Sequence, residues 1–339
     1  MKAVVTTKYG PPEVLEIREV EKPSPKDNEI LIKIFATTVT AGDSEMRSLD
    51  LPLGYQLMLR AGFGFRRPRN KIPGTEVAGE IEAIGKDVRL FKVGDQVFGS
   101  AGMGFGANAE YICLPEKPGE MEGGVAIKPA NMSYAEAATV PFGGRDALHF
   151  LRLGNIQSGQ RILINGAGGS IGTYGIQLAK HFGAEVTAID STAKLDMLRS
   201  IGADHVIDYT LEDFTKNGEI YDVIFDVVGK ISFSHSRNSI TQGGTYLLAN
   251  PASQMVQAFW KRMTSDNTVV MQTSSGTIAD LNYLRGLIEE GKLKAVIDRT
   301  FPLEQIVEAH RYVDKGGKKG NLVITVASES EAQQSWEGA

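Results

Sequence analysis

The stretch from Arg161 to Tyr209, which begins RILINGAGGSIGTYGIQLAK, is the part of the chain that decides the fold. It opens on a short apolar run at residues 162–164, which has the length and β-branched content of a strand. A glycine cluster follows, and apolar residues then recur at three- and four-residue spacing from Ile171 to Phe182, which predicts a helix that packs on a sheet. A strand, a glycine turn and a helix in this order favour a dinucleotide-binding fold over an ordinary tight turn.

The glycine turn and the strand after it supply the candidate cofactor residues. The register of Ala167, Gly169 and Gly172 fits a tight turn, a close approach of a pyrophosphate, and close packing of helix on strand. Residues 186–189 are expected to form the next strand, and Asp190 follows about 20 residues after the glycines, where a ribose partner is expected. The candidate cofactor-binding residues are therefore Gly166, Ala167, Gly168, Gly169, Ser170, Ile171, Gly172, Asp190 and Ser191, with Asn250 farther along the chain.

The composition is that of a globular enzyme large enough for two domains, with 339 residues and 42% hydrophobic residues. A net charge of −5 gives no electrostatic reason to expect nucleic acid or an anionic membrane as a partner. No apolar run reaches the ~20 residues of a bilayer span, and the first residues lack the apolar core of a secretory signal. We therefore expect a cytoplasmic protein. The single cysteine, Cys113, excludes an intrachain disulfide and a cysteine-rich zinc lobe.

The chain changes character near its middle. Residues 1–126 contain short β-branched runs separated by Pro and Gly clusters, which predicts a β-rich domain. After Lys128, a capping box formed by Ser133 and Glu136 predicts a helix start, and strand and helix patterns then alternate. This alternation predicts a parallel doubly wound sheet. The segment 296–326 is expected to return to the first domain.

An unusual segment lies between Leu51 and Lys71, with the sequence LPLGYQLMLRAGFGFRRPRNK. Its first half is apolar and its second half is strongly basic. We interpret it as a hydrophobic cover beside a solvated charged face rather than as a phosphate site.

Several short blocks occur in a specific order along almost the whole chain. They are MKAVV at 1–5, GTEVAG at 74–79, VGDQV at 93–97, AEY at 109–111, EAA at 136–138, the glycine turn, GADHVIDY at 202–209 and GGT at 243–245. With these blocks the chain resembles the medium-chain dehydrogenase/reductase superfamily, in its zinc-independent quinone oxidoreductase-like branch. The resemblance implies an α/β protein in which a discontinuous β-rich GroES-like catalytic domain, 1–126 and 278–327, accompanies a Rossmann dinucleotide-binding domain, 127–277. Residues 328–339 are polar and are expected to form a disordered tail.

The resemblance also predicts that no metal takes part. Zinc alcohol dehydrogenases of the superfamily bind catalytic zinc through two cysteines and a histidine, and by block alignment those positions hold Thr40, Thr75 and Phe142. Threonine is a poor zinc ligand and phenylalanine is none. Hydride delivery from a nicotinamide cofactor to an activated acceptor remains possible without a Lewis acid. The resemblance implies a quinone or an α,β-unsaturated carbonyl as that acceptor.

The acceptor side is expected near the block Thr40-Ala-Gly-Asp43-Ser-Glu45-Met-Arg47. Relatives often carry Asn-Pro-x-Asp-x-Tyr-x-Arg at this place, so Asp43 and Arg47 match while Glu45 stands at the tyrosine position. Thr40, Asp43 and Glu45 are the candidate catalytic residues, with a hydroxyl donor in Thr40 and a possible buried acid in Glu45. The alternative is a structural Asp43–Arg47 ion pair beside a solvated Glu45.

The choice between NADP(H) and NAD(H) depends on residues that disagree. In relatives that favour the phosphorylated cofactor, a lysine and a tyrosine bind the 2′-phosphate, and those positions match Lys194 and Tyr209. Asp190 favours NAD(H), because a carboxylate suits the ribose diol and repels a phosphate. Ser191 can hydrogen-bond either form. We expect NADP(H), with NAD(H) as the alternative.

The sequence therefore predicts a metal-independent NAD(P)H-dependent oxidoreductase that reduces quinones or enones. One alternative is a zinc-free alcohol or aldehyde oxidoreductase, and another is a catalytically weak nucleotide-binding scaffold. Relatives commonly dimerise through the edge strands of their Rossmann sheets. We expect a homodimer here, with residues 244–249 as the edge strand.

Overall fold

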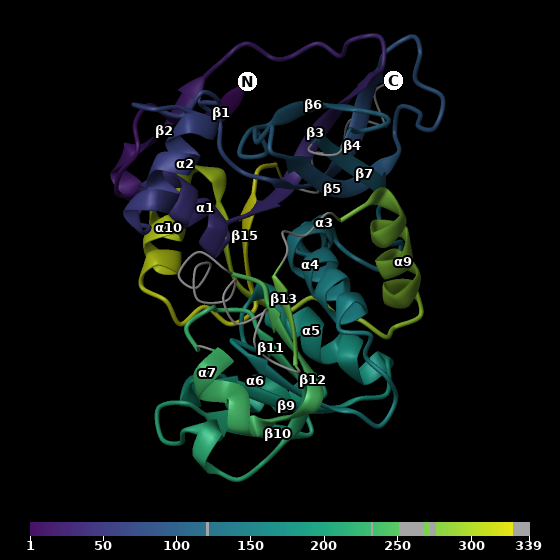
Figure 1. Ribbon diagram of the computed structural model, residues 1–339. Coiled ribbons are helices and arrows are strands. Elements are labelled where there is room, and N and C mark those ends of the chain that lie inside the picture. Colours follow the sequence, from purple (N-terminus) through teal and green to yellow (C-terminus); the bar gives the residue numbers. More distant parts are fainter. Residues whose placement is uncertain (120–121, 232, 251–266, 272–275, 328–339) are drawn as a thin grey trace. The chain divides into compact units, whose positions relative to one another are not determined.

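The computed structural model describes residues 1–119, 122–231, 233–250, 267–271 and 276–327 (Figure 1). The predicted disordered tail, 328–339, lies outside the described residues. The chain forms two compact units, one comprising Met1–Phe142, Thr277–Glu289 and Ile297–Ala339, the other Gly143–Gly276 and Glu290–Val296. The domain boundaries predicted from the sequence, by contrast, separate a GroES-like domain from a Rossmann domain. Compact units and folds need not share boundaries, so the predicted boundaries stay a prediction.

The second unit is built on a parallel sheet. Within the described residues its strands run in the order β10-β9-β8-β11-β12-β13, so the chain moves outward from β8 in one direction and then outward from β11 in the other. This is the predicted doubly wound arrangement, and the fold class is confirmed. The strands are β8 (Arg161–Asn165), β9 (Glu185–Asp190), β10 (His205–Asp208), β11 (Tyr221–Asp226), β12 (Ile240–Leu248) and β13 (Thr268–Met271).

Buried strands and amphipathic helices explain why this sheet forms. The apolar run of β8 is buried, as expected for a central parallel strand covered on both faces. Helix α5 packs against β8 and β9, and α6 packs against β10. Leu163, Ile189, Ile224 and Tyr246 belong to one buried cluster that joins neighbouring strands. The helices of this part of the chain are α4 (Val140–Leu153), α5 (Ser170–His181), α6 (Leu195–Ser200) and α7 (Phe233–Ser236).

The expected edge strand is wrong. Residues 244–249 were expected at the edge, but β12 pairs on its far side with β13, with Thr245 opposite Thr268 and Leu248 opposite Met271. The edge of the described sheet is therefore β13. Its four residues, TVVM, are too short a run to be recognised as a strand from their pattern alone.

The first unit contains a mainly antiparallel sheet. Its described strands run in the order β14-β15-β3-β4-β5-β7, with β6 paired to β3, and β1 and β2 form a separate ladder. Val323 of β15 pairs with Thr38 of β3, so the last segment does return to the first part of the chain. The strands are β1 (Lys2–Thr6), β2 (Leu15–Glu19), β3 (Glu29–Thr38), β4 (Glu76–Ile84), β5 (Gln96–Gly102), β6 (Tyr111–Pro115), β7 (Glu122–Ile127), β14 (Ile297–Pro302) and β15 (Asn321–Thr325).

The helices of the first unit begin at defined caps. The predicted capping box of Ser133 and Glu136 is present at α3, and a second box, formed by Thr40 and Asp43, starts α1. Helix α10 lies against α1 and against strands β14 and β15. The helices are α1 (Ala41–Ser48), α2 (Leu53–Phe63), α3 (Tyr134–Ala137), α9 (Ile278–Glu289) and α10 (Ile306–Asp314).

Helix α2 corrects the interpretation of the segment from Leu51 to Lys71. The expected hydrophobic cover would bury its apolar residues, but Leu53, Leu57 and Met58 are exposed and only Leu59 is buried. The helix packs through the face that carries Leu59, so most of its apolar side chains face solvent. The basic residues after it are exposed, as expected.

No helix within the described ranges combines the length and the apolar content that a membrane crossing would require.

We predict that Gly79→Ala destabilises the protein. Gly79 lies in β4 opposite Ile34 of β3, and a Cβ at this position would collide with the backbone oxygen of Lys33. Because a backbone atom cannot move aside cheaply, the loss of unfolding free energy should be on the order of 2 kcal/mol. The measurement is the midpoint of urea unfolding. Gly286→Ala in α9 is the matched control, since nothing lies within 4 Å of its Cβ position. That control should gain stability by about 0.5–1 kcal/mol. A loss of similar size in both variants would contradict the prediction.

Candidate active site

The glycine turn lies directly after β8. Gly166 has a φ of +78°, a left-handed conformation that suits glycine, and a Cβ there would collide with the Val228 side chain. A Cβ on Gly172 would lie 2.6 Å from the Ala167 Cα, so only glycine lets the helix start this close to the turn. The first N–H groups of a helix have no acceptor within that helix. In α5 these groups lie next to the glycine turn, because the helix begins at Ser170 with Gly169 as its N-cap. The turn therefore fits the pyrophosphate of a dinucleotide.

Asp190 ends β9, as expected, and its carboxylate lies against the glycine turn. Oδ2 accepts a hydrogen bond from the Gly168 N–H at 2.8 Å, and Oδ1 accepts one from the Ser191 N–H at 2.8 Å. The Lys194 ammonium forms an ion pair with Oδ1 at 3.0 Å, and the two side chains are only 7% and 11% exposed. The residues that were expected to compete over the cofactor thus form one buried, charge-neutral pair.

Tyr209 and Asn250 lie beyond the carboxyl ends of β10 and β12. Tyr209 is 61% exposed and donates its backbone N–H to the Asp190 carbonyl at 3.2 Å. A Cβ on Gly229, which has a φ of +72°, would lie only 2.1 Å from the Asn250 carbonyl oxygen. The predicted cofactor residues therefore lie at the carboxyl ends of the parallel strands, on both sides of the glycine turn. Parallel α/β sheets bind their ligands at these carboxyl ends, where the strand order reverses.

Asp226 is a candidate positioning residue that the sequence analysis missed. It is fully buried at the end of β11, where it accepts hydrogen bonds from Asn165 Nδ2 at 2.8 Å and from the Gly229 N–H at 2.9 Å. Its Oδ2 also accepts a bond from the Tyr246 hydroxyl at 3.0 Å. These contacts hold the loop 227–231 so that Val228 lies over the glycine turn. The signal was present in the sequence, as an acidic residue directly after an apolar strand and before Val-Val-Gly.

Thr40 and Asp43 lie together, but their polar groups form hydrogen bonds with each other. The Thr40 hydroxyl donates to Asp43 Oδ2 at 2.7 Å, and the same oxygen accepts the Thr40 N–H at 2.8 Å. Burial raises the pKa of the Asp43 carboxyl, an effect that the bonds from Thr40 oppose. Thr40 is thus a helix cap rather than a strand residue with a free hydroxyl. Glu45 lies on the same helix and is half-buried.

The alternative Asp43–Arg47 ion pair is wrong. Arg47 is buried, and its Nη2 donates to Asp314 Oδ2 on α10 at 2.8 Å. The capping box draws the Asp43 carboxylate toward the first turn of α1, whereas Arg47 lies in the last turn and faces α10. The basic residue therefore joins two helices of the first unit instead of pairing within its own helix.

Two of the positions matched to zinc ligands, Thr75 and Phe142, lie next to the buried carboxyl group of Glu76. The Thr75 carbonyl accepts the Ala101 N–H within the sheet, and the Phe142 N–H donates to Glu76 Oε1 at 2.7 Å. The other Glu76 oxygen accepts a short bond from the Thr38 hydroxyl. Burial raises the pKa of Glu76 to about 7. In the described part of the chain, no group of three or more His, Cys, Asp or Glu side chains is placed to hold a metal ion.

Glu76 is the second residue that the sequence analysis did not single out. Its signal is a carboxylate at the start of a strand, directly before Val-Ala-Gly and next to the Thr75 position. Two hydrogen-bond donors contact its oxygens, and no cation in the described part of the chain forms an ion pair with it. Its charge therefore depends on pH close to neutrality.

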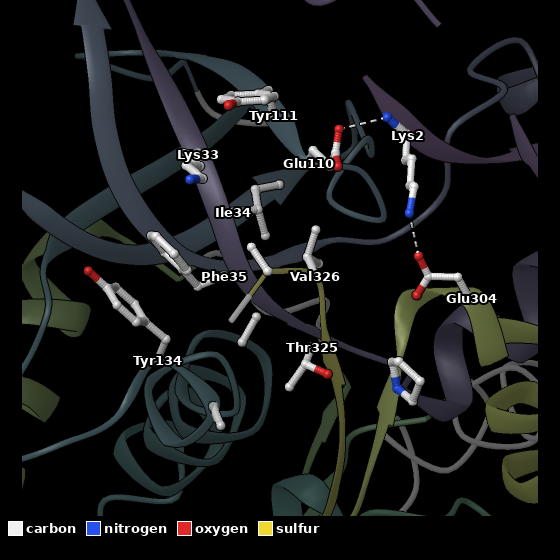
Figure 2. Close-up of a pocket in the computed structure, with 14 residues that line it drawn as sticks. Lys2, Lys33, Ile34, Phe35, Glu110, Tyr111, Tyr134, Glu304, Thr325 and Val326 are labelled. Carbon is white, nitrogen blue, oxygen red and sulfur yellow. Dashed lines mark hydrogen bonds and ion pairs between the residues drawn. The ribbon is translucent and has the colours of Figure 1, made fainter. Parts of the chain in front are cut away.

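A pocket of about 680 Å³ lies elsewhere in the first unit (Figure 2). The Phe35 and Tyr134 rings, stacked with centroids 4.6 Å apart, lie on one side of it, and the Lys2–Glu304 ion pair lies on the other. None of the predicted site residues lines this pocket.

Two family models match the chain. The model described as "Alcohol dehydrogenase GroES-like domain" matches residues 26–121, and the model described as "Zinc-binding dehydrogenase" matches residues 201–324. The first match falls on the β-rich part of the chain and the second begins in the parallel sheet.

Similar proteins match nearly the whole chain. The 2-methylene-furan-3-one reductase of Solanum lycopersicum is 34% identical over 336 residues, which cover 96% of this chain and 79% of that protein. The chloroplastic NADPH-dependent alkenal/one oxidoreductase of Arabidopsis thaliana is 33% identical over 337 residues, with the same coverage of 96% and 79%. Among solved structures, the quinone oxidoreductase from Coxiella burnetii superposes with a TM-score of 0.83 at 28% identity, covering 96% of this chain and 99% of that one. The chain is therefore an oxidoreductase that belongs to the medium-chain dehydrogenase/reductase superfamily, in its quinone oxidoreductase-like branch.

Proposed function

We propose that this chain is a metal-independent, NADP(H)-dependent reductase of quinones or α,β-unsaturated carbonyls. The observation that carries the proposal is the glycine cradle beside the Asp190–Lys194 pair, because it offers a phosphate site and a cation next to the expected ribose. The names of the similar proteins support the acceptor class, since they include a quinone oxidoreductase and an alkenal/one oxidoreductase.

The residues divide the binding of the cofactor between them. When bound, a reduced nicotinamide supplies a hydride to the acceptor. The glycine turn and the start of α5 would hold the pyrophosphate, and Asp190, Lys194 and Tyr209 would surround the adenosine ribose. Asp226 would position the loop 227–231 on the other side of the turn, toward the nicotinamide half.

The Asp190–Lys194 pair favours NADP(H). A lone carboxylate would repel a 2′-phosphate, but here the ammonium at 3.0 Å neutralises it. A similar protein is itself named as NADPH-dependent. NAD(H) remains the alternative, because the Asp190 carboxylate still ends β9 where a ribose diol would be bound.

The absence of metal in the reaction is part of the proposal. Thr40 is tied into a helix cap, and Thr75 and Phe142 contribute backbone groups to the sheet and to Glu76. None of these three groups is a ligand that zinc prefers. The zinc-free alcohol or aldehyde oxidoreductase and the weakly catalytic scaffold remain the competing functions.

We also propose a homodimer and a cytoplasmic location, both from the family resemblance and the sequence. The edge strand β13 offers unpaired backbone groups to a second copy, in place of the residues 244–249 that the sequence suggested.

The first prediction concerns the reaction. With NADPH as the donor, the protein should reduce quinones or enones at least tenfold faster than matched saturated aldehydes. Quinones and enones accept a hydride without a Lewis acid, whereas a simple aldehyde depends more on one. The measurement is NADPH oxidation in the presence of a chelator, together with elemental analysis of the purified protein. Equal rates with an aldehyde would favour the alcohol or aldehyde alternative, and no turnover with any acceptor would favour the scaffold. One tightly bound zinc ion per chain would contradict the metal-free proposal.

The second prediction concerns cofactor choice. Lys194→Ala removes the ammonium and leaves the Asp190 carboxylate uncovered, so kcat/KM for NADPH should fall by about 10- to 100-fold, the scale of about 1–3 kcal/mol for a charged hydrogen bond. The value for NADH, which lacks the phosphate, should change far less. Lys180→Ala is the matched control, because Lys180 pairs with Asp204 at 2.7 Å in the same unit but away from the turn. An unchanged NADPH/NADH ratio in Lys194→Ala would reassign the enzyme to NADH.

The third prediction concerns Glu76. The folded state keeps the Glu76 proton up to a pKa of about 7, whereas the unfolded chain releases it near 4.5, so wild-type stability falls as the pH rises between these values. Glu76→Gln removes this cost and can keep both hydrogen bonds. The variant should exceed the wild type by less than about 1 kcal/mol near pH 5 and by about 3 kcal/mol above pH 7, the free-energy equivalent of the pKa difference. Urea unfolding at both pH values measures this. A difference that does not depend on pH would show that Glu76 keeps an ordinary pKa.

A further inference from the structure

Helix α2 presents its apolar face to solvent. Leu53, Leu57 and Met58 are 71%, 50% and 53% exposed, and their spacing places them on one side of the helix. Leu59, on the opposite side, is buried. An exposed apolar face of this kind is unusual on a soluble protein and indicates a surface that something covers.

The chain after α2 brings positive charge next to that face. Phe65 is 67% exposed, and its carbonyl accepts a hydrogen bond from Arg60 Nη1 at 2.6 Å. The Gly64 carbonyl accepts the Tyr9 hydroxyl at 2.8 Å, which ties this turn to the body of the unit. The basic side chains that follow, all exposed, are Arg66, Arg67, Arg69 and Lys71. Together with Leu53, Leu57, Met58 and Phe65 they form what we call the α2 surface.

A neighbouring loop extends the apolar character of this surface. The Phe105 ring meets Phe63 edge-on with centroids 5.7 Å apart, and the Gly104 carbonyl accepts a hydrogen bond from Asn70 at 2.6 Å. Met103, in the same loop, is 49% exposed.

The positive charge of the α2 surface is not neutralised locally. Residues 51–75 contain four arginines and one lysine and no acidic residue, whereas the whole chain carries a net charge of −5. Among the described residues, none of these five cations pairs with a carboxylate, and the side-chain hydrogen bonds of Arg60 and Arg69 go to backbone carbonyls. Because charges are screened beyond about 8 Å at physiological salt, this local excess decides what approaches the surface, and the net charge of the chain does not.

We propose that the α2 surface binds the face of an anionic lipid bilayer. The exposed apolar side chains would enter the boundary between headgroups and acyl chains, and the arginines and the lysine would contact anionic headgroups. This peripheral contact goes beyond the reaction and depends on neither the cofactor nor the acceptor. It also revises the expectation, drawn from net charge alone, that no membrane is a partner.

The charge pattern favours a bilayer over other occupants. A two-fold contact between copies of this chain would place the same surface against itself, with its four cations facing the four cations of the second copy. A nucleic acid would be attracted by the cations, but phosphate contacts give no role to exposed Leu53, Leu57 and Met58. An anionic bilayer satisfies both halves of the surface at once.

The test is sedimentation of the full chain with lipid vesicles at physiological ionic strength. We expect binding to phosphatidylserine-rich vesicles, weak or no binding to phosphatidylcholine vesicles, and release at high salt. The double variant Arg66→Glu/Arg67→Glu and the double variant Leu57→Asn/Met58→Asn should each weaken binding at least about tenfold. All four side chains are exposed, so the fold should survive, which the thermal unfolding midpoint verifies.

The matched control is Lys86→Glu/Lys216→Glu, which changes the net charge equally at side chains that are 71% and 78% exposed. It should bind vesicles like the wild type. Failure of the wild type to bind phosphatidylserine vesicles would overturn the proposal, and so would an equal loss in the control, which would mean that bulk charge decides. A dimer in sedimentation velocity that Leu57→Asn/Met58→Asn dissociates would assign the α2 surface to a second copy instead.

Discussion

Close packing around the glycine turn is the constraint on which the proposed cofactor site of the second unit depends. Gly172 lets α5 begin against the turn, and Gly166 lets the Val228 loop lie over it. A Cβ on Gly168 would collide with Asp190 and Lys194, so the same turn also admits that ion pair. The proposed phosphate site, the Asp190–Lys194 pair at the proposed ribose site and the packing of Val228 over the turn all depend on the absence of side chains at these glycines.

In the first unit, the buried carboxyl groups of Asp43 and Glu76 accept hydrogen bonds, and neither forms an ion pair among the described residues. Asp43 is satisfied by Thr40, and Glu76 by the Phe142 N–H and the Thr38 hydroxyl. The loss of water on burial outweighs both these hydrogen bonds and the attraction of the Lys318 charge, so both carboxyl groups have raised pKa values. Of the two, Glu76 has a pKa of about 7, so its protonation changes close to neutral pH.

The sequence errors share a physical cause. Asp43 and Arg47 have the spacing of a helical ion pair, yet the capping box draws Asp43 toward Thr40, and Arg47 finds Asp314 far along the chain. Asp190 and Lys194 were treated as rivals, although their spacing allows the ion pair that they form. The apolar residues of α2 were expected to be buried because they are apolar. In each case the prediction used the residue type alone. The residues that surround a side chain in the fold decide which group it pairs with and whether it is buried.

The sequence by itself determined the doubly wound sheet, the position of the glycine turn, Asp190 at the end of β9, and the Ser133–Glu136 cap. These depend on periodicity and spacing within a few residues, which the chain carries locally. Only the tertiary structure decided that β13 covers β12, that Asp226 anchors the loop 227–231, that Glu76 meets Phe142, and that α2 turns its apolar face outward. Those contacts join residues far apart in sequence, and their energies depend on burial and on which groups lie next to each other in the fold. The local sequence pattern determines neither the burial nor the neighbouring groups.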